Sequence, residues 1–414
     1  MDVPSQPAAA VPVRKPLMPL DEALAHMLDG MQPVADVETV DTATALGRVL
    51  AADLVSGIDV PPADNSAMDG YAVRCHELPD EGVALPVSAR IAAGQVGAAL
   101  QPGTAARIFT GAPIPVGADA VVMQEHTEPA GDGHVRICRI PEPGQNIRCR
   151  GEDIAAGSTV LRAGARLTPQ ALGVAASVGA ARLTVRRRPR VALLSTGDEL
   201  VMPGQPLHPG AIYNSNRYTL RGLIEAAGAQ CSDLGIVPDD LEATRRALRE
   251  AAHGHDVIVS SGGVSVGEAD HLRPAVQAEG ELTLWQLAIK PGKPLAFGRV
   301  GAAAFVGLPG NPVASFVTFL LLVRPLLQRL SGGSAEAVHP LLLQADFEWT
   351  RPDPARREFL RARRDGARVV IHERQGSGVL TSAHWADGLV DLAPGQVVQR
   401  GEAVPFLPFG ELGC

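Results

Sequence analysis

The sequence predicts a multi-domain protein of the α/β and β classes. With 414 residues, the chain is too long for one ordinary hydrophobic core, so several domains are expected. Between about residues 190 and 330, apolar β-branched runs alternate with helical patterns, which indicates a parallel-rich sheet covered on both faces. On either side of this region, short alternating runs separated by glycine and proline predict β domains.

The N-terminal half begins with a proline-rich tail over residues 1–17, which we expect to be disordered and which does not resemble a signal peptide. From about Pro19 to Ala52 the apolar spacing is helical. Short β runs then fill residues 58–146. Helical signal returns where Thr168 is expected to cap a helix. The pattern therefore predicts a discontinuous helical linker domain, residues 18–57 and 147–187, interrupted by an inserted β domain at 58–146.

Residues 188–335 carry the α/β pattern. The strand "VALLSTGDEL" precedes a helix near Asn216–Ala227, and "CSDLGIV" precedes a helix opened by Asp239 and Asp240. Further strands are expected at "DVIV", "LTLWQLAIK", "PLAFG" and "AAFVG", and a final helix at Asn311. Short strands resume over residues 336–414, which favours a C-terminal β-barrel or sandwich domain.

Composition narrows the function classes. The net charge of -8 argues against general nucleic-acid binding, and the cluster of arginines at 186–190 is interpreted as a solvated linker. The five cysteines are scattered without CxxC spacing, which disfavours disulfides and zinc and fits a reducing cytosol. The most apolar run, "FVTFLLLVRPLL", is too short to span a membrane. We therefore expect a cytoplasmic protein without a membrane partner.

Three glycine-rich loops are predicted at the carboxyl ends of the parallel strands, where such sheets bind ligands. No dinucleotide fingerprint or Walker loop is present. For the first and third loops, a plain turn into a helix is an equal alternative. Three loops at one sheet edge nevertheless favour a phosphate or oxyanion site. The residues predicted to bind there are Ser195, Thr196 and Gly197; Ser260, Ser261, Gly262, Gly263 and Ser265; and Pro309 and Pro312.

Carboxylates accompany this oxyanion cradle. Glu199, Asp239 and Asp270 would repel a phosphate unless a divalent cation lay between them, and hard oxygen ligands point to Mg²⁺. Lys290 and Lys293, in the rigid turn "IKPGKP", would add positive charge. The alternative for these lysines is an ordinary solvated surface.

Several long strings carry a family resemblance: "DNSAMDGYAV", "FTGAPIPVGADAVVMQE", "GQNIRCRGEDI", "STGDEL", "SSGGVSVGEAD", "IKPGKP" and "GLPGNPV". In this order, over residues 18–414, they resemble the MoeA family of molybdopterin molybdenumtransferases, which is related to the catalytic domain of gephyrin. The resemblance implies a three-layer α/β molybdopterin-binding domain, an inserted β domain, a helical linker domain and a C-terminal β-barrel. It further implies a homodimer that inserts molybdate into adenylylated molybdopterin with Mg²⁺-dependent release of AMP.

Carried over to this sequence, the family pattern implies catalytic roles for Asp59, Thr110, Glu199, Asp239 and Asp270. In the family, the inserted domain of one subunit reaches the sheet edge of the other. Because the pterin supplies two sulfurs, the chain needs no cysteine cluster for molybdenum, only an oxyanion site. Lys290 and Lys293 would form it, completed by Ser377 and by Arg357 or Arg361. One departure is Ala314, where relatives often have serine.

Two other functions stay open at this point. The molybdopterin adenylyltransferase that precedes this step, a possible partner enzyme, would share the α/β fold but would not need the inserted or C-terminal domains. A non-catalytic gephyrin-like scaffold would tolerate loss of Asp270 and the lysines, yet all three side chains are present.

Overall fold

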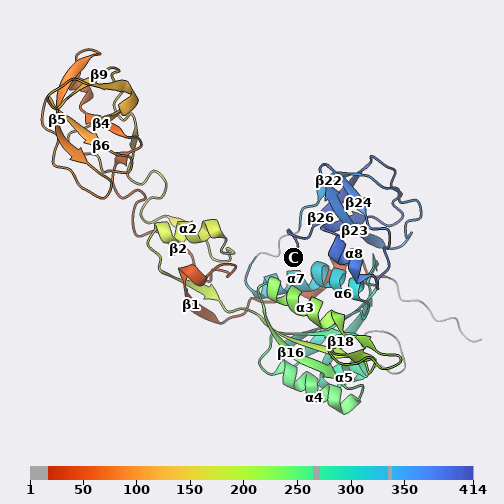
Figure 1. The fold of residues 1–414 in the computed structure, drawn as a ribbon. Helices are drawn as coiled ribbons and strands as arrows, with labels where there is room; N and C mark the ends of the chain where they lie inside the picture. Colours follow the sequence, from red (N-terminus) through yellow and green to blue (C-terminus); the bar gives the residue numbers. More distant parts are fainter. Residues whose placement is uncertain (1–16, 264–270, 334–337, 414) are drawn as a thin grey trace, which may run out of the picture. The chain divides into compact units, whose positions relative to one another are not determined.

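The computed structural model describes residues 17–263, 271–333 and 338–413 (Figure 1). Its contacts divide the chain into two compact units. Unit 1 contains Met1–Glu38, Gly47–Val49 and Val185–Cys414. Unit 2 contains Thr39–Leu46 and Leu50–Thr184. The predicted site loops and the C-terminal domain belong to unit 1, and the inserted β domain belongs to unit 2. Ser265 and Asp270 lie outside the described residues.

A six-stranded sheet forms the centre of unit 1, with strand order β16-β13-β17-β21-β20-β18. The first four strands are mutually parallel, whereas β20 is antiparallel to both of its neighbours, β21 and β18. This confirms the parallel-rich sheet. The strands are β13 (Arg190–Thr196), β16 (Gln230–Val237), β17 (Val257–Ser261), β18 (Gly280–Gln286), β20 (Pro294–Val300) and β21 (Ala303–Leu308).

Helices cover both faces of this sheet, so the predicted three-layer architecture is confirmed (Figure 1). Along β13, Val191 and Leu193 pack into one apolar cluster, and Ala192 and Leu194 pack into the other, as strand alternation requires. The helices of the first cluster are α1 (Leu20–Leu28), α3 (Ser215–Ala226), α6 (Pro312–Thr318) and α7 (Arg324–Leu330); those of the second are α4 (Leu241–Ala252) and α5 (Leu272–Glu279).

Local capping chemistry fixes where two of these helices begin. The side chain of Asn214 accepts a hydrogen bond from the backbone of Arg217 at the start of α3. Asp240 accepts one from Ala243 at the start of α4, as predicted. Between α6 and α7 the chain continues as a π-helical segment, Phe319–Val323. The whole run Pro312–Leu330 is long and apolar enough to cross a membrane, but 83% of its most apolar window is buried inside the molecule, as in a core helix.

The helix expected from Pro19 to Ala52 is much shorter than predicted. It ends at Leu28, and β1 (Val37–Asp41) follows. Pro33 prevents continuation of the helix, and the β-branched residues after it favour an extended chain. The short helix still packs firmly, because Ala23 and Met27 are fully buried in the core of unit 1.

The arginine cluster before β13 is not a purely solvated linker. Arg187 donates to both carboxylate oxygens of Asp256 at 3.0 Å, and its Nε donates to Asp36 at 3.0 Å. Asp256 also accepts the backbone N–H of Arg190 at 2.7 Å. The Asp256 carboxylate is the main reason that the pKa of Arg187 is raised. Arg187 therefore connects the segment that leads into β13 to the residues just before β17.

The C-terminal part of unit 1 is a closed barrel. Of the two folds expected for this region, a barrel or a sandwich, the barrel is the one observed. Its five strands run β23-β24-β22-β26-β25, and β25 pairs back onto β23. A short strand of the α/β domain, β19 (Ile289–Lys290), adds to β23 in parallel. The barrel elements are β22 (Leu341–Ala345), β23 (Arg357–Asp365), β24 (Arg368–Ile371), α8 (Leu380–Trp385), β25 (Gly388–Leu392) and β26 (Ala403–Pro408).

Unit 2 contains the expected β module, a six-stranded sheet of order β7-β4-β6-β5-β9-β8. Its strands are β4 (Gly70–Val73), β5 (Val83–Ile91), β6 (Ala105–Ile108), β7 (Ala120–Met123), β8 (Thr127–Pro129) and β9 (His134–Ile137). Thr168 caps α2 (Pro169–Ser177) as predicted.

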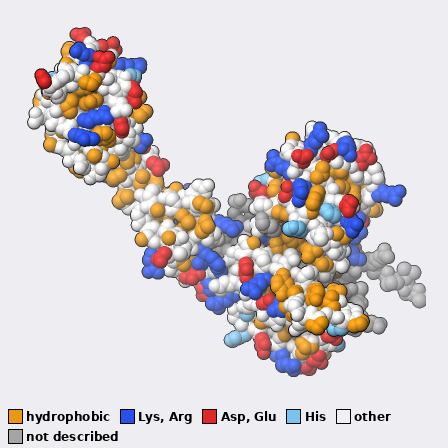
Figure 2. Space-filling model, in the orientation of Figure 1, with side chains coloured by type: hydrophobic (Ala, Val, Ile, Leu, Met, Phe, Trp, Pro, Cys, Tyr) orange, Lys and Arg blue, Asp and Glu red, His pale blue; other side chains and the backbone are white. Residues whose placement is uncertain are grey.

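Short strand pairs and single turns complete the chain. The pairs are β1 with β12 (Arg182–Arg186), β2 (Leu54–Val55) with β11 (Thr159–Leu161), β3 (Asn65–Ser66) with β10 (Ile147–Arg148), and β14 (Leu200–Val201) with β15 (Ile212–Tyr213). The turns are η1 (Thr42–Thr44), η2 (Cys75–Glu77) and η3 (Gln124–His126). Basic and acidic side chains are interspersed over the face of each unit that Figure 2 shows.

Candidate functional site

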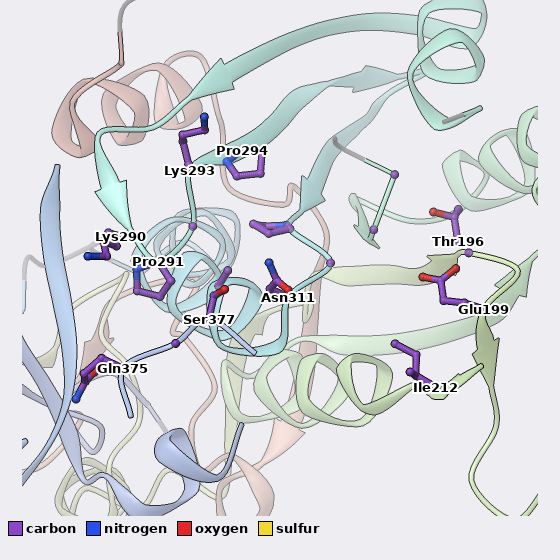
Figure 3. A pocket seen from close by; sticks show the side chains of 18 of the residues that line it. Thr196, Glu199, Ile212, Lys290, Pro291, Lys293, Pro294, Asn311, Gln375 and Ser377 are labelled. Atoms are coloured by element: carbon purple, nitrogen blue, oxygen red, sulfur yellow. The ribbon is translucent and has the colours of Figure 1, made fainter. Parts of the chain in front are cut away.

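A cavity of about 810 Å³ lies in unit 1, at the carboxyl edge of the parallel sheet (Figure 3). Both the α/β domain and the barrel contribute to it. Its lining comprises Thr196, Gly197, Glu199, Ile212, Asp239, Gly262, Gly263, Lys290, Pro291, Gly292, Lys293, Pro294, Pro309, Gly310, Asn311, Ala314, Arg356, Gln375, Gly376 and Ser377. The volume is that of a site for a small molecule or cofactor.

Glycine allows the loops at the sheet edge to approach one another closely. Gly262 has φ +90°, and a Cβ there would lie 2.9 Å from the backbone oxygen of Thr196. Gly263 has φ +68°, and its Cβ would lie 2.9 Å from Oγ1 of Thr196. Other residues would both strain the backbone and clash. The glycines thus leave backbone and a hydroxyl, rather than bulky side chains, facing the cavity.

Two carboxylates line one side of the cavity. Glu199 folds back over Gly197, and its backbone oxygen accepts the N–H of Ile212 at 2.8 Å. Half-buried Asp239 follows β16, and its N–H donates to Oδ1 of Asp198 at 3.3 Å, which joins the loops after β13 and β16. Within the described ranges, no group of three or more His, Cys, Asp or Glu residues is placed to hold a metal. Glu199 and Asp239 carry hard oxygen ligands of the kind that Mg²⁺ binds in proteins, where it usually keeps several waters and also binds phosphate.

Positive charge gathers at the other side of the cavity. Figure 3 shows Lys290 and Gln375 across the cavity from Thr196 and Glu199. Nζ of Lys290 lies 2.9 Å from Oε1 of Glu358. The Lys293 side chain is exposed and has no hydrogen-bond or ion-pair partner among the residues that the structure describes.

The loop before α8 brings barrel residues to the same end. The Gln375 side chain accepts the N–H of Arg361 at 2.9 Å and donates to the carbonyl of Arg361 at 2.9 Å. The carbonyl of Ser377 accepts the N–H of Val313 at 2.9 Å, so the loop is fastened to the first turn of α6. This arrangement holds the half-buried Ser377 beside the cavity.

The structure brings most of the sequence-predicted site residues of the α/β domain together. Those in the cavity lining are Thr196, Gly197, Glu199, Asp239, Gly262, Gly263, Lys290, Lys293 and Pro309. Ser195, Ser260 and Ser261 are instead buried within β13 and β17. Ser261 Oγ accepts from Nδ2 of Asn216 at 2.8 Å, so it supports the sheet edge from inside. Pro312 begins α6 and is absent from the lining.

Asp59 and Thr110 belong to unit 2. Asp59 accepts the backbone N–H of Ala156 at 2.8 Å and Nε of Arg150 at 2.5 Å, and these bonds, in that order, lower its pKa. Thr110 donates from both its backbone and its hydroxyl to Oδ1 of Asp69, each at 2.8 Å. Both predicted catalytic residues therefore also have local structural roles.

Two arginines expected at the cavity have other partners. Arg357 forms a forked pair with Asp391, with N···O distances of 2.6 and 2.5 Å. Arg361 is 1% exposed, and burial lowers its pKa to about 10. The cavity arginine is their neighbour Arg356, which sequence reasoning missed. Ala314 also lines the cavity, while the hydroxyl of the adjacent Ser315 is buried without a partner within the described residues.

Lysine usage is a signal that marks this site. The chain contains three lysines, Lys15, Lys290 and Lys293, against 34 arginines, and two of the three line the cavity. A composition so biased towards arginine makes these two positions exceptional. Lysine presents a compact point charge where arginine presents a broad planar fork.

Comparison with known families covers most of the chain. Residues 18–179 match the model of the MoeA N-terminal region (domain I and II), residues 192–329 match that of a probable molybdopterin binding domain, and residues 345–409 match that of the MoeA C-terminal region (domain IV).

Individual relatives agree with these matches. The molybdopterin molybdenumtransferase of Haemophilus influenzae is 44% identical, over 76% of this chain and 78% of that protein. The one from a Nostoc species is 40% identical, over 94% and 88%. The crystal structure of the molybdopterin biosynthesis MoeA protein of Pyrococcus horikoshii OT3 is similar with a TM-score of 0.82 at 30% identity, covering 95% of this chain and 100% of that one.

Proposed function

The chain belongs to the MoeA family of molybdopterin molybdenumtransferases, enzymes of molybdenum cofactor biosynthesis, and we propose that its large cavity is where the transfer takes place. In this proposal adenylylated molybdopterin and molybdate bind together. The two dithiolene sulfurs replace two oxygens of molybdate, which take up protons and leave as water, and water cleaves the phosphoanhydride to release AMP. The observation that carries the proposal is the separation of charge in one cavity, with Glu199 and Asp239 on one side and Lys290, Lys293 and Arg356 on another.

The lysine end is suited to molybdate. Two ammonium groups, the Arg356 guanidinium and the Ser377 hydroxyl offer positive charge and hydrogen-bond donors to a tetrahedral dianion. No cysteine lines the cavity within the described residues, so soft ligation of molybdenum falls to the dithiolene of the substrate. The chain's own contribution is to hold the oxyanion near those sulfurs.

The carboxylate end is suited to the adenylyl phosphates with Mg²⁺. Glu199 and Asp239 would hold the ion together with phosphate oxygens, which agrees with the hard-oxygen donor set that Mg²⁺ prefers. When bound, Mg²⁺ neutralises phosphate charge and stabilises the leaving phosphate. The backbone around Gly262 and Gly263 would cradle the same phosphates. Asp270, outside the described residues, stays a sequence-based prediction for this end.

We further propose a cytoplasmic homodimer in which Asp59 and Thr110 of one subunit serve the cavity of its partner, and which receives its pterin from the upstream adenylyltransferase. The support is the family resemblance of these positions, together with the hydrogen bonds that orient each of them within its own unit. The bonds at Asp59 also keep its carboxylate ionised, because they lower its pKa.

A molybdopterin adenylyltransferase or a non-catalytic scaffold is favoured less. The barrel supplies Arg356 and Ser377 to the cavity, and an adenylyltransferase built on the α/β domain alone would have no such residues.

An assay of the full chain can distinguish the adenylyltransferase activity from the molybdenumtransferase activity. With molybdopterin and ATP but no molybdate, we expect no pyrophosphate. With adenylylated molybdopterin, Mg²⁺ and molybdate, we expect AMP and molybdenum-loaded pterin. Pyrophosphate formation, or binding without either product, would contradict the proposal.

A further inference from the structure

A buried carboxylate lies behind the basic end of the cavity. Glu358, on β23 of the barrel, is 1% exposed and does not line the cavity itself. A buried carboxylate is strongly unfavourable unless cations or N–H donors satisfy its oxygens. The hydrogen-bond partners of Glu358 therefore indicate the role of this carboxylate.

Three donors converge on this carboxylate. Oε1 accepts from Nζ of Lys290 at 2.9 Å. Oε2 accepts from Nε1 of Trp349 at 2.8 Å and from the backbone N–H of Asp353 at 2.9 Å. The indole and the backbone N–H fix the carboxylate from the barrel side, which leaves Oε1 directed at the lysine.

The contact with Asp353 extends the network to the second cavity cation. Oδ2 of Asp353 accepts from Nε and a terminal nitrogen of Arg356 at 2.8 and 2.5 Å. Oδ1 accepts the backbone N–H of Arg356 at 3.0 Å. The Arg356 side chain is the main reason that the pKa of Asp353 is lowered, so this link stays ionised at neutral pH. Two cations of the cavity are thus connected to one buried acid.

The register of two paired strands brings Lys290 next to Glu358. In the parallel pairing of β19 with β23, Lys290 is the partner of Glu358. Lys290 comes from the α/β domain and Glu358 comes from the barrel, so the ion pair joins the two domains at the cavity. Lys293, three residues further on, has no such partner among the described residues.

From this geometry we propose that Glu358 is a positioning residue for the transfer, which holds the Lys290 ammonium directly and the Arg356 guanidinium through Asp353. The inference rests on the proposed function, because it assumes that these cations face the oxyanion. Glu358 touches no substrate in this scheme. It sets where the two positive charges lie before molybdate arrives, which lowers the cost of ordering them on binding.

The first test needs no catalysis. Because Lys290 and Lys293 are two of three lysines, amine acylation of the folded full chain can be followed at each by peptide mass spectrometry. We expect Lys290 to react about tenfold more slowly than Lys293 in the wild type, since its ammonium is held by a charge-assisted bond. In Glu358→Gln the two rates should become similar. Equal rates in the wild type, or an unchanged ratio in a folded Glu358→Gln variant, would overturn the pairing.

The second test uses molybdate titration of cofactor formation. Glu358→Gln should raise the molybdate concentration for half-maximal rate by about tenfold, while the rate at saturating molybdate changes little. Adding Lys290→Met to Glu358→Gln should give no more than Lys290→Met alone, because both remove one interaction. Additive effects would overturn the role of Glu358. Asp346→Asn, which breaks an ion pair with Arg400 elsewhere on the barrel, should leave the titration unchanged.

Further outcomes separate this inference from the function on which it rests. An unchanged molybdate requirement in Lys290→Met would overturn the placement of the oxyanion, and with it any role of Glu358. A raised requirement in Lys290→Met but not in Glu358→Gln would overturn only the role of Glu358. If Glu358→Gln fails to fold, Asp353→Asn is the variant to measure. It should raise the molybdate requirement through Arg356 and leave the labelling of Lys290 unchanged. A molybdate requirement equal to that of the wild type would overturn the network.

Discussion

The Cβ that Gly197 lacks would lie 2.6 Å from Oε2 of Glu199. Glu199 therefore packs directly over the glycine, in a loop where φ of Gly197 is +135°. Any side chain at this position would strain the backbone and displace the carboxylate. The relationship makes the position of one cavity carboxylate depend on a neighbour that has no functional group of its own.

We expect Gly197→Ala to lose most of its Mg²⁺-stimulated turnover and about 1–3 kcal/mol of stability, the usual cost of a strained backbone conformation. The measurements are the metal dependence of AMP release and urea unfolding. Gly222→Ala, at an open position on α3, is the matched control and should be neutral or slightly stabilising. Normal turnover in Gly197→Ala would mean that the position of Glu199 does not matter to the reaction.

Lys293→Ala should raise the molybdate concentration needed for insertion and leave the affinity for adenylylated molybdopterin nearly intact. The reason is that Lys293 offers an ammonium without a protein partner among the described residues, so its charge is available to the oxyanion. Molybdate titration and pterin binding by fluorescence measure the two effects separately. Loss of pterin affinity with an unchanged molybdate requirement would reverse the assignment.

Replacement of Lys293 by arginine should not restore the wild-type molybdate requirement, although the charge is kept. The planar guanidinium is larger than an ammonium, and its donors are arranged for bidentate hydrogen bonds. Arg299→Lys, at an exposed site on β20 outside the cavity lining, is the reverse exchange and should have no effect. If Lys293→Arg behaves as the wild type, the scarcity of lysine in this chain has no bearing on the site.

Thiol reactivity tests the packing of unit 2. Burial, together with the nearby Asp119, raises the pKa of the Cys75 thiol to about 12. Because the thiolate is the nucleophile, a raised pKa leaves Cys75 protonated and slow to alkylate at pH 8. Its rate should rise about tenfold per pH unit between pH 8 and 10. Exposed Cys149 should be alkylated first by iodoacetamide. Equal labelling of the two at pH 8 would contradict the buried environment of Cys75.

Subunit mixing tests the shared site. Chains with Asp59→Ala and chains with Glu199→Gln should each be inactive alone. A mixed dimer should recover activity, because it contains one site that is free of both substitutions. The measurement is turnover after co-refolding, with heterodimers demonstrated by two affinity tags. Demonstrated heterodimers without activity would remove the case for cavities completed by a partner subunit.

Much of the fold follows from local sequence patterns. The strand–helix rhythm, Asp240 and Thr168 as caps and the parallel-rich sheet required only periodicity and turn chemistry. The helix predicted to Ala52 was wrong, because the strand propensity that begins after Pro33 outweighs a weakly helical spacing. Ser260 and Ser261 were predicted to be loop residues that bind the ligand, but β17 extends through both and both are buried.

The barrel side of the cavity was the hardest part to predict. Arg356 and Gln375 are distant in sequence from the glycine loops, and only tertiary packing brings them to the cavity. Which of Arg356, Arg357 and Arg361 faces the cavity depends on where β23 begins and on its register. A shift of one residue would move every side chain of the strand to the other face. Lys290 and Lys293 themselves were predicted, from the rigid turn "IKPGKP" and from the family resemblance, and the scarcity of lysine in the chain is a further signal for them.

AMP release from adenylylated molybdopterin measures whether one cavity couples molybdate at its lysine end to adenylyl cleavage at its carboxylate end. We expect AMP in equal amount to molybdenum-loaded pterin, and only when molybdate and Mg²⁺ are both present. In Glu199→Gln the rate of AMP release should fall by several orders of magnitude, since metal stabilisation of the leaving phosphate is a large effect. AMP released at the full rate without molybdate, with chelated metal, or by the Glu199→Gln variant would contradict this coupling.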